Sequence, residues 1–265
     1  MSAAPLPYPV ATLGDGRARA ILFDSAKCIG CRQCVEGCKD WNDLPRGNAY
    51  RIGASTWLTI EPPLLEGSSP IWGRNSCMHC RYPLCAAVCP VEAITKYEEG
   101  PVVIDQGACI GCELCVHACP WHVIAKDPAS NKASKCTMCH DRVAEDSPPF
   151  CVQACPVGAL EFGLLDELDA RAAARAQERH AHVYGRREAG GTQVLHLLDA
   201  SPGEHGNPEV GPQRYPAHRI PFGTMAKAFF SMRGGIGGKW RAIKNALGKP
   251  WRLKYRYWHR PEVSP

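Results

Sequence analysis

The hydrophobic and polar positions along the sequence predict short elements separated by long irregular stretches. Apolar and β-branched runs predict four strands, at residues 19–24 (RAILFD), 56–60 (TWLTI), 101–105 (PVVID) and 192–198 (TQVLHLL). Each run is only five to seven residues long. The pattern therefore predicts short strands.

Helical periodicity is clearest at residues 164–182. This stretch is Ala-rich, and Leu165, Leu168 and Ala172 recur on one face. It predicts an amphipathic helix. Residues 91–94 predict one helical turn, and residues 126–135 predict a polar connector.

Cysteines occur at regular spacings along the sequence. The chain has 16 cysteines, which form four runs of four with none left over. The runs, in sequence order, are Cys28, Cys31, Cys34, Cys38; Cys77, Cys80, Cys85, Cys89; Cys109, Cys112, Cys115, Cys119; and Cys136, Cys139, Cys151, Cys155.

The spacing within the runs is typical of iron–sulfur ligation. The third run is C-x2-C-x2-C-x3-C-P, the bacterial pattern for 4Fe-4S clusters. The second run is the same pattern with two residues inserted, the first has Lys39 in place of the proline, and the fourth has a longer loop between Cys139 and Cys151. The sequence therefore predicts four 4Fe-4S clusters.

The pattern also predicts which cysteines share a cluster. In proteins with two clusters, the first three cysteines of a run hold one cluster and the fourth reaches the other. The two central runs then exchange their last cysteines, and by symmetry the two outer runs do the same. We name the resulting ligand sets by number: set 1 is Cys28, Cys31, Cys34, Cys155; set 2 is Cys136, Cys139, Cys151, Cys38; set 3 is Cys77, Cys80, Cys85, Cys119; set 4 is Cys109, Cys112, Cys115, Cys89.

Two other uses of the cysteines remain open from the sequence. Disulfides are disfavoured, because cysteine is too sparse for a disulfide scaffold and the C-x2-C pairs have ligand spacing. Zinc is the stronger alternative, since two C-x2-C pairs can build a four-thiolate zinc site, and it would make the protein a zinc-stabilised interaction protein. Zinc does not require the third and fourth cysteines or the proline.

The predicted fold is α+β, with two interleaved ferredoxin-like units. One unit would be inserted into the other, and a helix and strand extension and a basic aromatic tail would follow. The predicted divisions are a mobile lead-in at 1–18, a split first unit at 19–76 and 121–163, an inserted second unit at 77–120, the extension at 164–210, and the tail at 211–265.

Charge separates the tail from the rest. The net charge of the whole sequence is +5, yet residues 214–265 hold twelve Lys and Arg against one acid, Glu262. Docking to an acidic partner subunit is the favoured interpretation, followed by contact with an anionic membrane surface. Nucleic-acid binding is disfavoured, because no such motif accompanies the charge. We expect no export signal at residues 1–20 and no transmembrane segment.

Three residues near the cysteines have two interpretations each. His79 lies inside the CMHC segment and could ligate, but the predicted ligand sets are already full, which favours a residue that supports a cluster without ligating it or that lies at the surface. Lys126 and Lys135 either offset cluster charge or belong to a solvated connector. We expect no catalytic residue, because a cube with four thiolates has no open coordination position.

Over residues 20–210 the sequence resembles the iron–sulfur (beta) subunit of formate dehydrogenases, within the four-cluster electron-transfer subunits of molybdenum and tungsten bis-pterin oxidoreductases. The motifs that carry the resemblance are KCIGCRQCVEGCKDWND at 27–43, CMHC at 77–80, KCTMCHDRV at 135–143 and GGTQVLHLLD from residue 190. The WND and GGTQV segments resemble formate dehydrogenase in particular.

The resemblance implies a partner catalytic subunit that holds the molybdenum or tungsten pterin, and a downstream electron acceptor. The alternative is the same role beside a dimethyl sulfoxide, polysulfide, thiosulfate or aldehyde oxidoreductase. Membrane-bound relatives have a C-terminal transmembrane helix where this sequence has its basic tail. Such subunits reside in the cytoplasm, or in the periplasm after export with the catalytic subunit, and the sequence does not choose between them.

Overall fold

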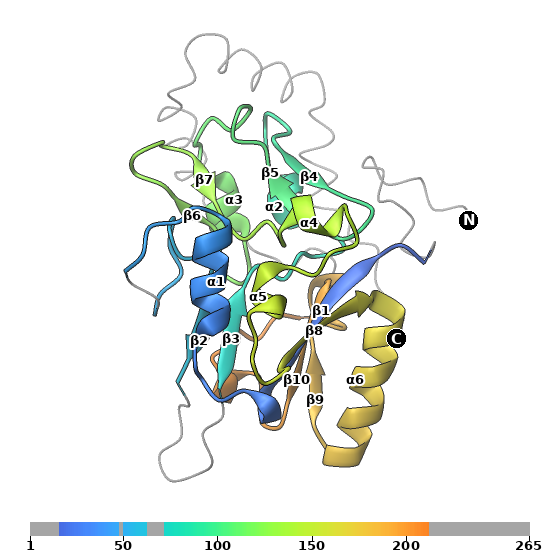
Figure 1. Cartoon of the computed structure of the whole chain (residues 1–265). Coiled ribbons are helices and arrows are strands. Elements are labelled where there is room, and N and C mark those ends of the chain that lie inside the picture. The colour runs from blue at the N-terminus through green and yellow to red at the C-terminus, as the bar shows by residue number, and fades with distance from the viewer. Residues whose placement is uncertain (1–15, 48–49, 63–71, 212–265) are drawn as a thin grey trace, which may run out of the picture.

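The computed structural model describes residues 16–47, 50–62 and 72–211, and all structural statements here concern those residues (Figure 1). The mobile lead-in expected at residues 1–18 falls largely outside them. So does the basic tail, apart from its first residue. Secondary structure is mixed and the sheets are small, in agreement with the predicted α+β class.

The largest sheet joins the start of the chain to its later part. Its strands are β1 (Arg19–Asp24), β8 (Leu160–Leu164), β9 (His182–Tyr184) and β10 (Val194–Leu198), in the order β8-β1-β10-β9. β1 runs parallel to β10 and antiparallel to β8, and β10 runs antiparallel to β9. Both neighbours of β1 thus come from beyond the last cysteine.

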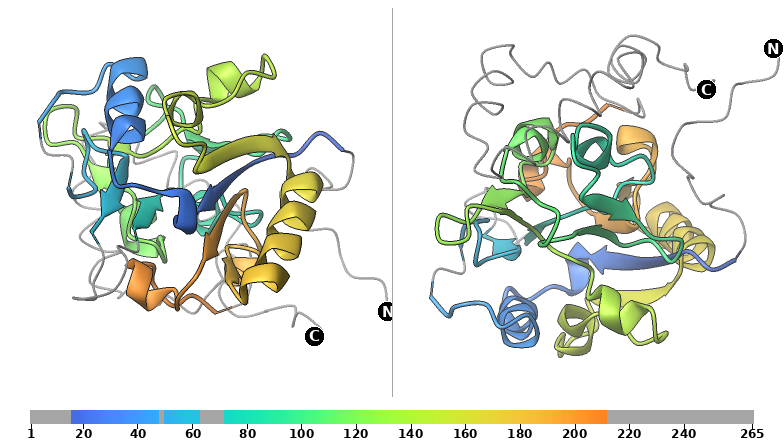
Figure 2. Two further views of the ribbon diagram at one scale, coloured as in Figure 1. Left: turned by 60° about the horizontal axis from the view of Figure 1, so that its bottom comes forward. Right: turned by 90° about the horizontal axis from the view of Figure 1, so that it is seen from above.

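Helix α6 (Leu165–Arg179) covers one face of this sheet (Figure 2). The apolar stripe predicted from the sequence is buried there, and Leu168 is 1 % exposed. Burying one such side chain contributes about 1.5–3 kcal/mol. The stripe and the sheet residues that it packs against form one cluster: Ala20, Leu22, Leu165, Leu168, Ala172, Leu195 and Leu197.

The other face of the sheet packs against the cysteine region. Ile21, Phe23 and Val194 point that way and belong to a second, larger cluster that includes seven of the cysteines among its buried members. Because both faces of β1 are covered, all but its first residue are buried.

The cysteine region is made of short segments. Its strands form three two-stranded ladders: β2 (Leu58–Glu61) with β3 (Gly73–Ser76), β4 (Ile94–Lys96) with β5 (Val102–Ile104), and β6 (Ala125–Lys126) with β7 (Ala133–Ser134). Its helices are α1 (Gln33–Trp41), α2 (Leu84–Ala87), α3 (Leu114–Ala118), α4 (His140–Val143) and α5 (Phe150–Gln153).

Three single 3-10 turns complete the described part of the protein. They are η1 (Ser25–Lys27), η2 (Glu188–Gly190) and η3 (Gly203–His205). η1 connects β1 to the first cysteine run. The other two turns lie on either side of β10.

Most predicted elements are present, and two expectations are wrong. The four strands and the helix occur within three residues of their predicted bounds at either end. The helical turn expected at residues 91–94 is absent, because Ile94 instead begins β4, which pairs with β5. The connector expected at residues 126–135 forms the β6–β7 ladder, where Ala125 pairs with Ser134.

Candidate metal centre

Short helices present the cysteines. α1 carries Cys34 and Cys38, α2 carries Cys85, α3 carries Cys115 and α5 carries Cys151. Among the 16 cysteines, which the structure describes completely, Cys31 is the exposed one and the others are buried or half-buried. The thiols are therefore collected inside the region, with set 1 nearest the surface.

The C-x2-C pairs share one backbone conformation. The residue just before the second cysteine has a positive φ in each run: Gly30 (68°), His79 (47°), Gly111 (67°) and Met138 (59°). Two of the runs therefore place a non-glycine residue in the left-handed region, at some conformational cost. In the fourth run the Met138 N–H lies 3.3 Å from the Cys136 Sγ, so the turn directs a backbone donor at a thiol.

Glycine is required at Gly111 for a second reason. A Cβ there would lie 1.9 Å from the carbonyl oxygen of Asn131, in addition to the strained φ. The segment that follows β6 therefore presses directly on the cysteine loop of the third run.

The first predicted set is assembled from both ends of the cysteine region. Burial raises the pKa of Cys28, and the charges of Cys155 and Cys31 raise it further. Burial, followed by the charges of Cys151, Cys28 and Cys155, raises the pKa of Cys34 to about 12. The structure thus brings the thiols of set 1 together, across more than 120 residues of sequence.

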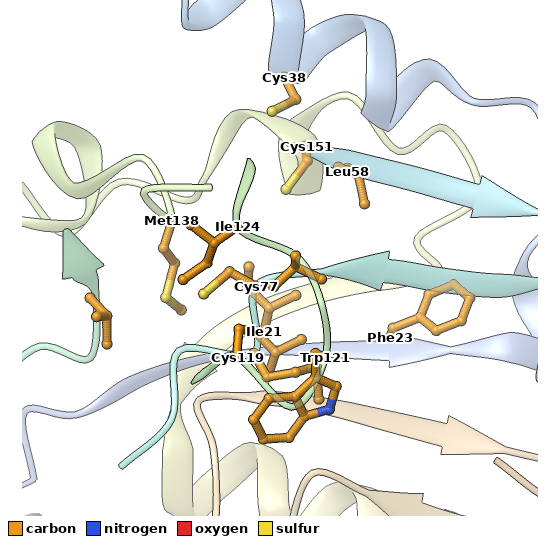
Figure 3. Packing of buried hydrophobic residues seen from close by; sticks show 14 of the residues in the cluster. Ile21, Phe23, Cys38, Leu58, Cys77, Cys119, Trp121, Ile124, Met138 and Cys151 are labelled. Carbon is orange, nitrogen blue, oxygen red and sulfur yellow. The ribbon is translucent and has the colours of Figure 1, made fainter. Parts of the chain in front are cut away.

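Set 2 is assembled in the same way. Burial raises the pKa of Cys38 well above its usual value, and the next causes are the charges of Cys136, Cys151 and Cys139. α1 packs against α5 and thereby brings Cys38 to Cys151. Figure 3 shows these two side chains approaching from the two helices.

Sets 3 and 4 come from the two central runs. Burial and then the charges of Cys77, Cys85 and Cys119 raise the pKa of Cys80. The pKa of Cys115 is likewise raised by burial, and its neighbours are Cys85, Cys112, Cys89 and Cys109. Each thiol named here lies near the other members of its predicted set. That the members of a set ligate one cluster stays a prediction.

Three electrostatic interactions between thiols link neighbouring sets. After burial, Cys151 of set 2 is the main influence that raises the pKa of Cys34 in set 1. Cys77 of set 3 acts in the same way on Cys136 of set 2. Cys85 of set 3 acts on Cys115 of set 4. The four sets therefore lie in a row, in the order 1-2-3-4.

Buried cations lie among the thiols. Arg74 on β3 is 1 % exposed and Lys135 is 3 % exposed. Burial raises the pKa of Cys151 and the charge of Arg74 opposes that rise. Burial alone would lower the pKa of Lys135, yet the nearby thiols, Cys77 first, raise it overall. Lys135 is therefore not part of a solvated connector.

His79 is fully buried, so the interpretation of this residue as a surface histidine is wrong. Its Nδ1 accepts a hydrogen bond from the backbone N–H of Val102 at 2.9 Å, whereas its Nε2 has no partner among the described residues. Burial, followed by the charges of Lys135, Lys96 and Arg74, holds the pKa of His79 well below its usual value. The imidazole is thus neutral, with its Nε2–H available to an acceptor beside set 3.

Lys39, which replaces the proline of the first run, has a structural role. It is buried, and its Nζ donates to the carbonyl oxygens of Pro45 and Ser55 and to the Thr56 hydroxyl, at 2.9, 2.9 and 3.0 Å. The lysine ties the loop that follows α1 to the body of the region. Lys126 instead pairs with Glu113 at 2.6 Å.

The donor set fits iron–sulfur cubes. Within the described residues no three His, Cys, Asp or Glu side chains converge as ligands of a single metal ion. A cube does not need such convergence, because each of its four thiolates binds a different iron. Arg74 and Lys135 also have no carboxylate at ion-pair distance within the part of the protein that is described. A buried cation without an anion is costly, and a bound anionic cluster would remove that cost.

Sequence reasoning singled out Lys135 but missed two other cations of this region, Arg74 and Lys96. Arg74 lies in a segment, GRNS, that has no apolar alternation, and Lys96 ends a strand of three residues. Lys96 is held by the carbonyl oxygen of His79 and the Gln193 side chain, at 3.1 and 2.6 Å. The only sign of Arg74 and Lys96 in the sequence is a basic residue close to a cysteine run. Such residues are too common for this sign to identify a buried cation.

Comparison with known proteins agrees with this chemistry. A family model described as a 4Fe-4S dicluster domain matches residues 71–165, and a 4Fe-4S binding domain matches residues 25–41. The formate dehydrogenase-O iron-sulfur subunit of Escherichia coli is 34% identical over 212 residues, which cover 72% of this chain and 71% of the relative. The formate dehydrogenase iron-sulfur subunit of Haemophilus influenzae is 34% identical over 199 residues, covering 68% and 64%.

A third relative has a different name. The B subunit of the anaerobic dimethyl sulfoxide reductase of Escherichia coli is 38% identical over 159 residues, which cover 56% of this chain and 74% of the relative. The shared part is therefore shorter, and its identity is slightly higher.

The thiols and the matching domains define an electron-transfer protein that carries 4Fe-4S clusters. The protein belongs to the family of formate dehydrogenase iron–sulfur subunits, of which the subunit from Escherichia coli is covered over more than two thirds of its length. In the described residues, no helix has both the length and the apolar character needed to cross a bilayer.

Proposed function

We propose that this protein carries four 4Fe-4S clusters, one on each set, and that it relays electrons between the catalytic subunit of a formate dehydrogenase and a downstream acceptor. A bound cluster of this type supplies one-electron redox chemistry. The protein supplies four thiols for each site, buries them, and keeps neighbouring sites adjacent.

The row of sets is the observation that carries this proposal. The charge of Cys151 acts on Cys34, that of Cys77 on Cys136 and that of Cys85 on Cys115, so each set lies close enough to the next for its thiols to interact electrostatically. The exposed thiol, Cys31, lies in set 1 at one end of the row, near Ile29 at 59% exposure. Electrons would enter or leave the protein there.

The pairing of the outer runs has a direct test. If set 1 takes its fourth thiol from Cys155, then Cys155→Ser and Cys31→Ser should alter the same one of the four reduction midpoints. Cys38→Ser and Cys139→Ser should alter a different one. Redox titration followed by electron paramagnetic resonance measures this. A Cys155→Ser change that matched that of Cys139→Ser would contradict the pairing.

The same pairing supports the interleaved domain arrangement. Sets 3 and 4 draw only on residues 77–120, whereas sets 1 and 2 need thiols from both sides of that stretch. The inserted unit of 77–120 and the split unit of 19–76 and 121–163 follow from this. The large sheet joins β1 of the split unit to β10 of the 164–210 extension, so these two parts share one core.

The partner is inferred from the relatives. Relatives named as formate dehydrogenase iron–sulfur subunits match about 70% of this chain, which supports a molybdenum- or tungsten-pterin subunit as the partner. The protein has no catalytic residue of its own in this proposal. Isolation of the native complex under anaerobic conditions should yield a large pterin subunit and formate-dependent dye reduction.

A dimethyl sulfoxide reductase complex is the second candidate. The 38% identity to the B subunit of such an enzyme, over 159 residues, supports this candidate. The two candidates separate in one assay on the native complex. Formate-dependent dye reduction supports the first, and reoxidation of reduced dye by dimethyl sulfoxide supports the second.

A further inference from the structure

Two buried cations lie at junctions between adjacent sets. Arg74 acts on Cys34 of set 1 and on Cys38 and Cys151 of set 2. The Arg74 Nη1 donates to the Ser76 hydroxyl at 2.6 Å, which fixes the guanidinium next to the second cysteine run. Arg74 therefore marks the junction between sets 1 and 2.

Lys135 marks the next junction. Its Nζ donates to the carbonyl oxygens of Val102 and Cys136, the latter at 2.9 Å. Its charge acts on Cys136 of set 2 and on Cys77 and Cys85 of set 3. The ammonium is thus held by neutral backbone groups between two sets of thiols.

The third junction, between sets 3 and 4, differs from the other two. The largest influences on Cys89, Cys112 and Cys115 are burial, other thiols and backbone N–H groups, and no cation is among them. The nearby Lys126 is neutralised by Glu113. Set 4 is therefore the set that lacks a buried positive charge.

We propose that Arg74 and Lys135 are fixed charges that raise the reduction potentials of the clusters on either side of them: sets 1 and 2 for Arg74, and sets 2 and 3 for Lys135. This inference rests on the proposed ligation of one cluster by each set. Set 2 receives both charges and set 4 receives neither.

The physical reason is the sign of the charge that reduction adds. One electron from the reductant enters a cluster, so the site becomes more negative by one elementary charge. A cation in a low-dielectric interior stabilises that state more than the oxidised one. Arg74 and Lys135 are well suited to this role, since each is buried without a carboxylate among the described residues that would cancel its charge.

The test compares Lys135→Met, Arg74→Met and the double variant with the unaltered full-length protein. Iron content is measured first, and the four midpoints are then found by titration with a chemical reductant, followed by electron paramagnetic resonance. Each single variant should lower two midpoints. Each should change the ratio of reduced to oxidised cluster at a fixed potential by at least tenfold, which is about 59 mV for one electron.

The pattern of shifts is more specific than their size. One midpoint should fall in both single variants and fall furthest in the double variant, which identifies set 2. One midpoint should stay unchanged in all three, which identifies set 4. Lys132→Met is the matched control, because Lys132 lies three residues before Lys135 and its Nζ contacts the Gln106 carbonyl at an exposed position. It should leave all four midpoints in place.

Several results would overturn the inference. Unchanged midpoints in both single variants would do so, and so would an equal fall of all four or an equal effect of Lys132→Met. Loss of iron from both single variants would assign Arg74 and Lys135 to assembly instead. If only one of the two single variants loses iron, the midpoints of the other variant test the inference. In each case, four midpoints in the wild-type protein would still support the proposed function. Fewer clusters in the wild-type protein would count against the proposed function itself.

Discussion

The molecule has two parts that are stabilised in different ways: the large sheet with α6, and the cysteine region. Leu168 and its neighbours form a closed apolar layer between the helix and the sheet, as in an ordinary small domain. The cysteine region has helices of four to nine residues and ladders of two to four residue pairs, and seven of the buried members of its core are cysteines. Segments this short are not stable alone. The comparison teaches that one part is stabilised by packing and the other by its ligands.

Removal of iron should produce the largest difference in amide protection between the two parts. Anaerobic treatment of the full-length protein with an iron chelator should abolish the protection of amide hydrogens in α1 to α5, because metal binding and folding are coupled in such regions. Amides of β1 and β10 should keep much of their protection. Hydrogen exchange with mass spectrometry measures both, and equal loss from α3 and β10 would contradict the distinction.

Gly37→Ala should weaken cluster binding in sets 1 and 2 but not in sets 3 and 4. A Cβ at Gly37 would lie 2.9 Å from both the Ala154 Cβ and the Phe150 Cδ1, so α1 and α5 could not approach as they do. Overpacking of this kind costs about 1–3 kcal/mol. We expect iron to be lost from sets 1 and 2 while sets 3 and 4 remain filled.

Iron analysis and the number of reduction midpoints measure this outcome. Gly53→Ala is the control, because a Cβ at Gly53 would meet nothing within 4 Å. A Gly37→Ala variant with the full iron content of the wild type would show that the helices adjust at little cost.

Leu168→Ala should affect the other part. The side chain is 1 % exposed, and truncation of a buried leucine to alanine costs about 2–5 kcal/mol. Amide exchange in α6 and β10 should accelerate, with iron content unchanged. Glu167→Ala, one residue earlier on the exposed face, should change neither. Loss of iron from Leu168→Ala would show that the two parts depend on each other more than their packing suggests.

Glu161→Gln should have the smallest effect. Burial would raise the pKa of Glu161, but hydrogen bonds from Arg175, Arg171 and Lys27 lower it to about 2. Because the folded pKa lies below the ordinary value of 4.5, the stabilisation is present above that value and is lost as the pH falls toward 2. Two of its partners, Lys27 and Arg171, are 42% and 47% exposed, so solvent screens these ion pairs and we expect a loss below about 1 kcal/mol at pH 7.

Thermal unfolding at pH 7 measures this loss, and the difference from the wild type should narrow at pH 4. Glu167→Gln, on the exposed face of α6, is the comparison variant. A difference that grew on acidification would contradict the assigned sign.

The sequence predicted the elements better than it predicted the surroundings of the thiols. The apolar pattern located α6 and β10 within a few residues, because periodicity records which face is buried. The spacing of the runs predicts which thiols share a cluster, because the first three cysteines of a run hold one cluster and the fourth reaches another, and this pairing stays a prediction. The sequence did not reveal the burial of Arg74, because that burial depends on segments that are distant in the sequence.

His79 and Lys135 show the same limit. Each had two interpretations in the sequence, and the choice between them depended on burial, which comes from the packing of β5 and of the thiols around them. Ile94 shows a different limit, since a short apolar segment after a proline has no periodicity to separate a helical turn from a strand. Pairing with Ile104 across β4 and β5 decides it.

The position of β1 in the large sheet has a consequence for biosynthesis. β1 is translated first among the strands, yet β8 and β10, which flank it, both follow Cys155. On the ribosome the strand must wait, without either neighbour, until every thiol has emerged from the exit tunnel. Sheet closure is therefore a late event that joins two distant parts of the sequence.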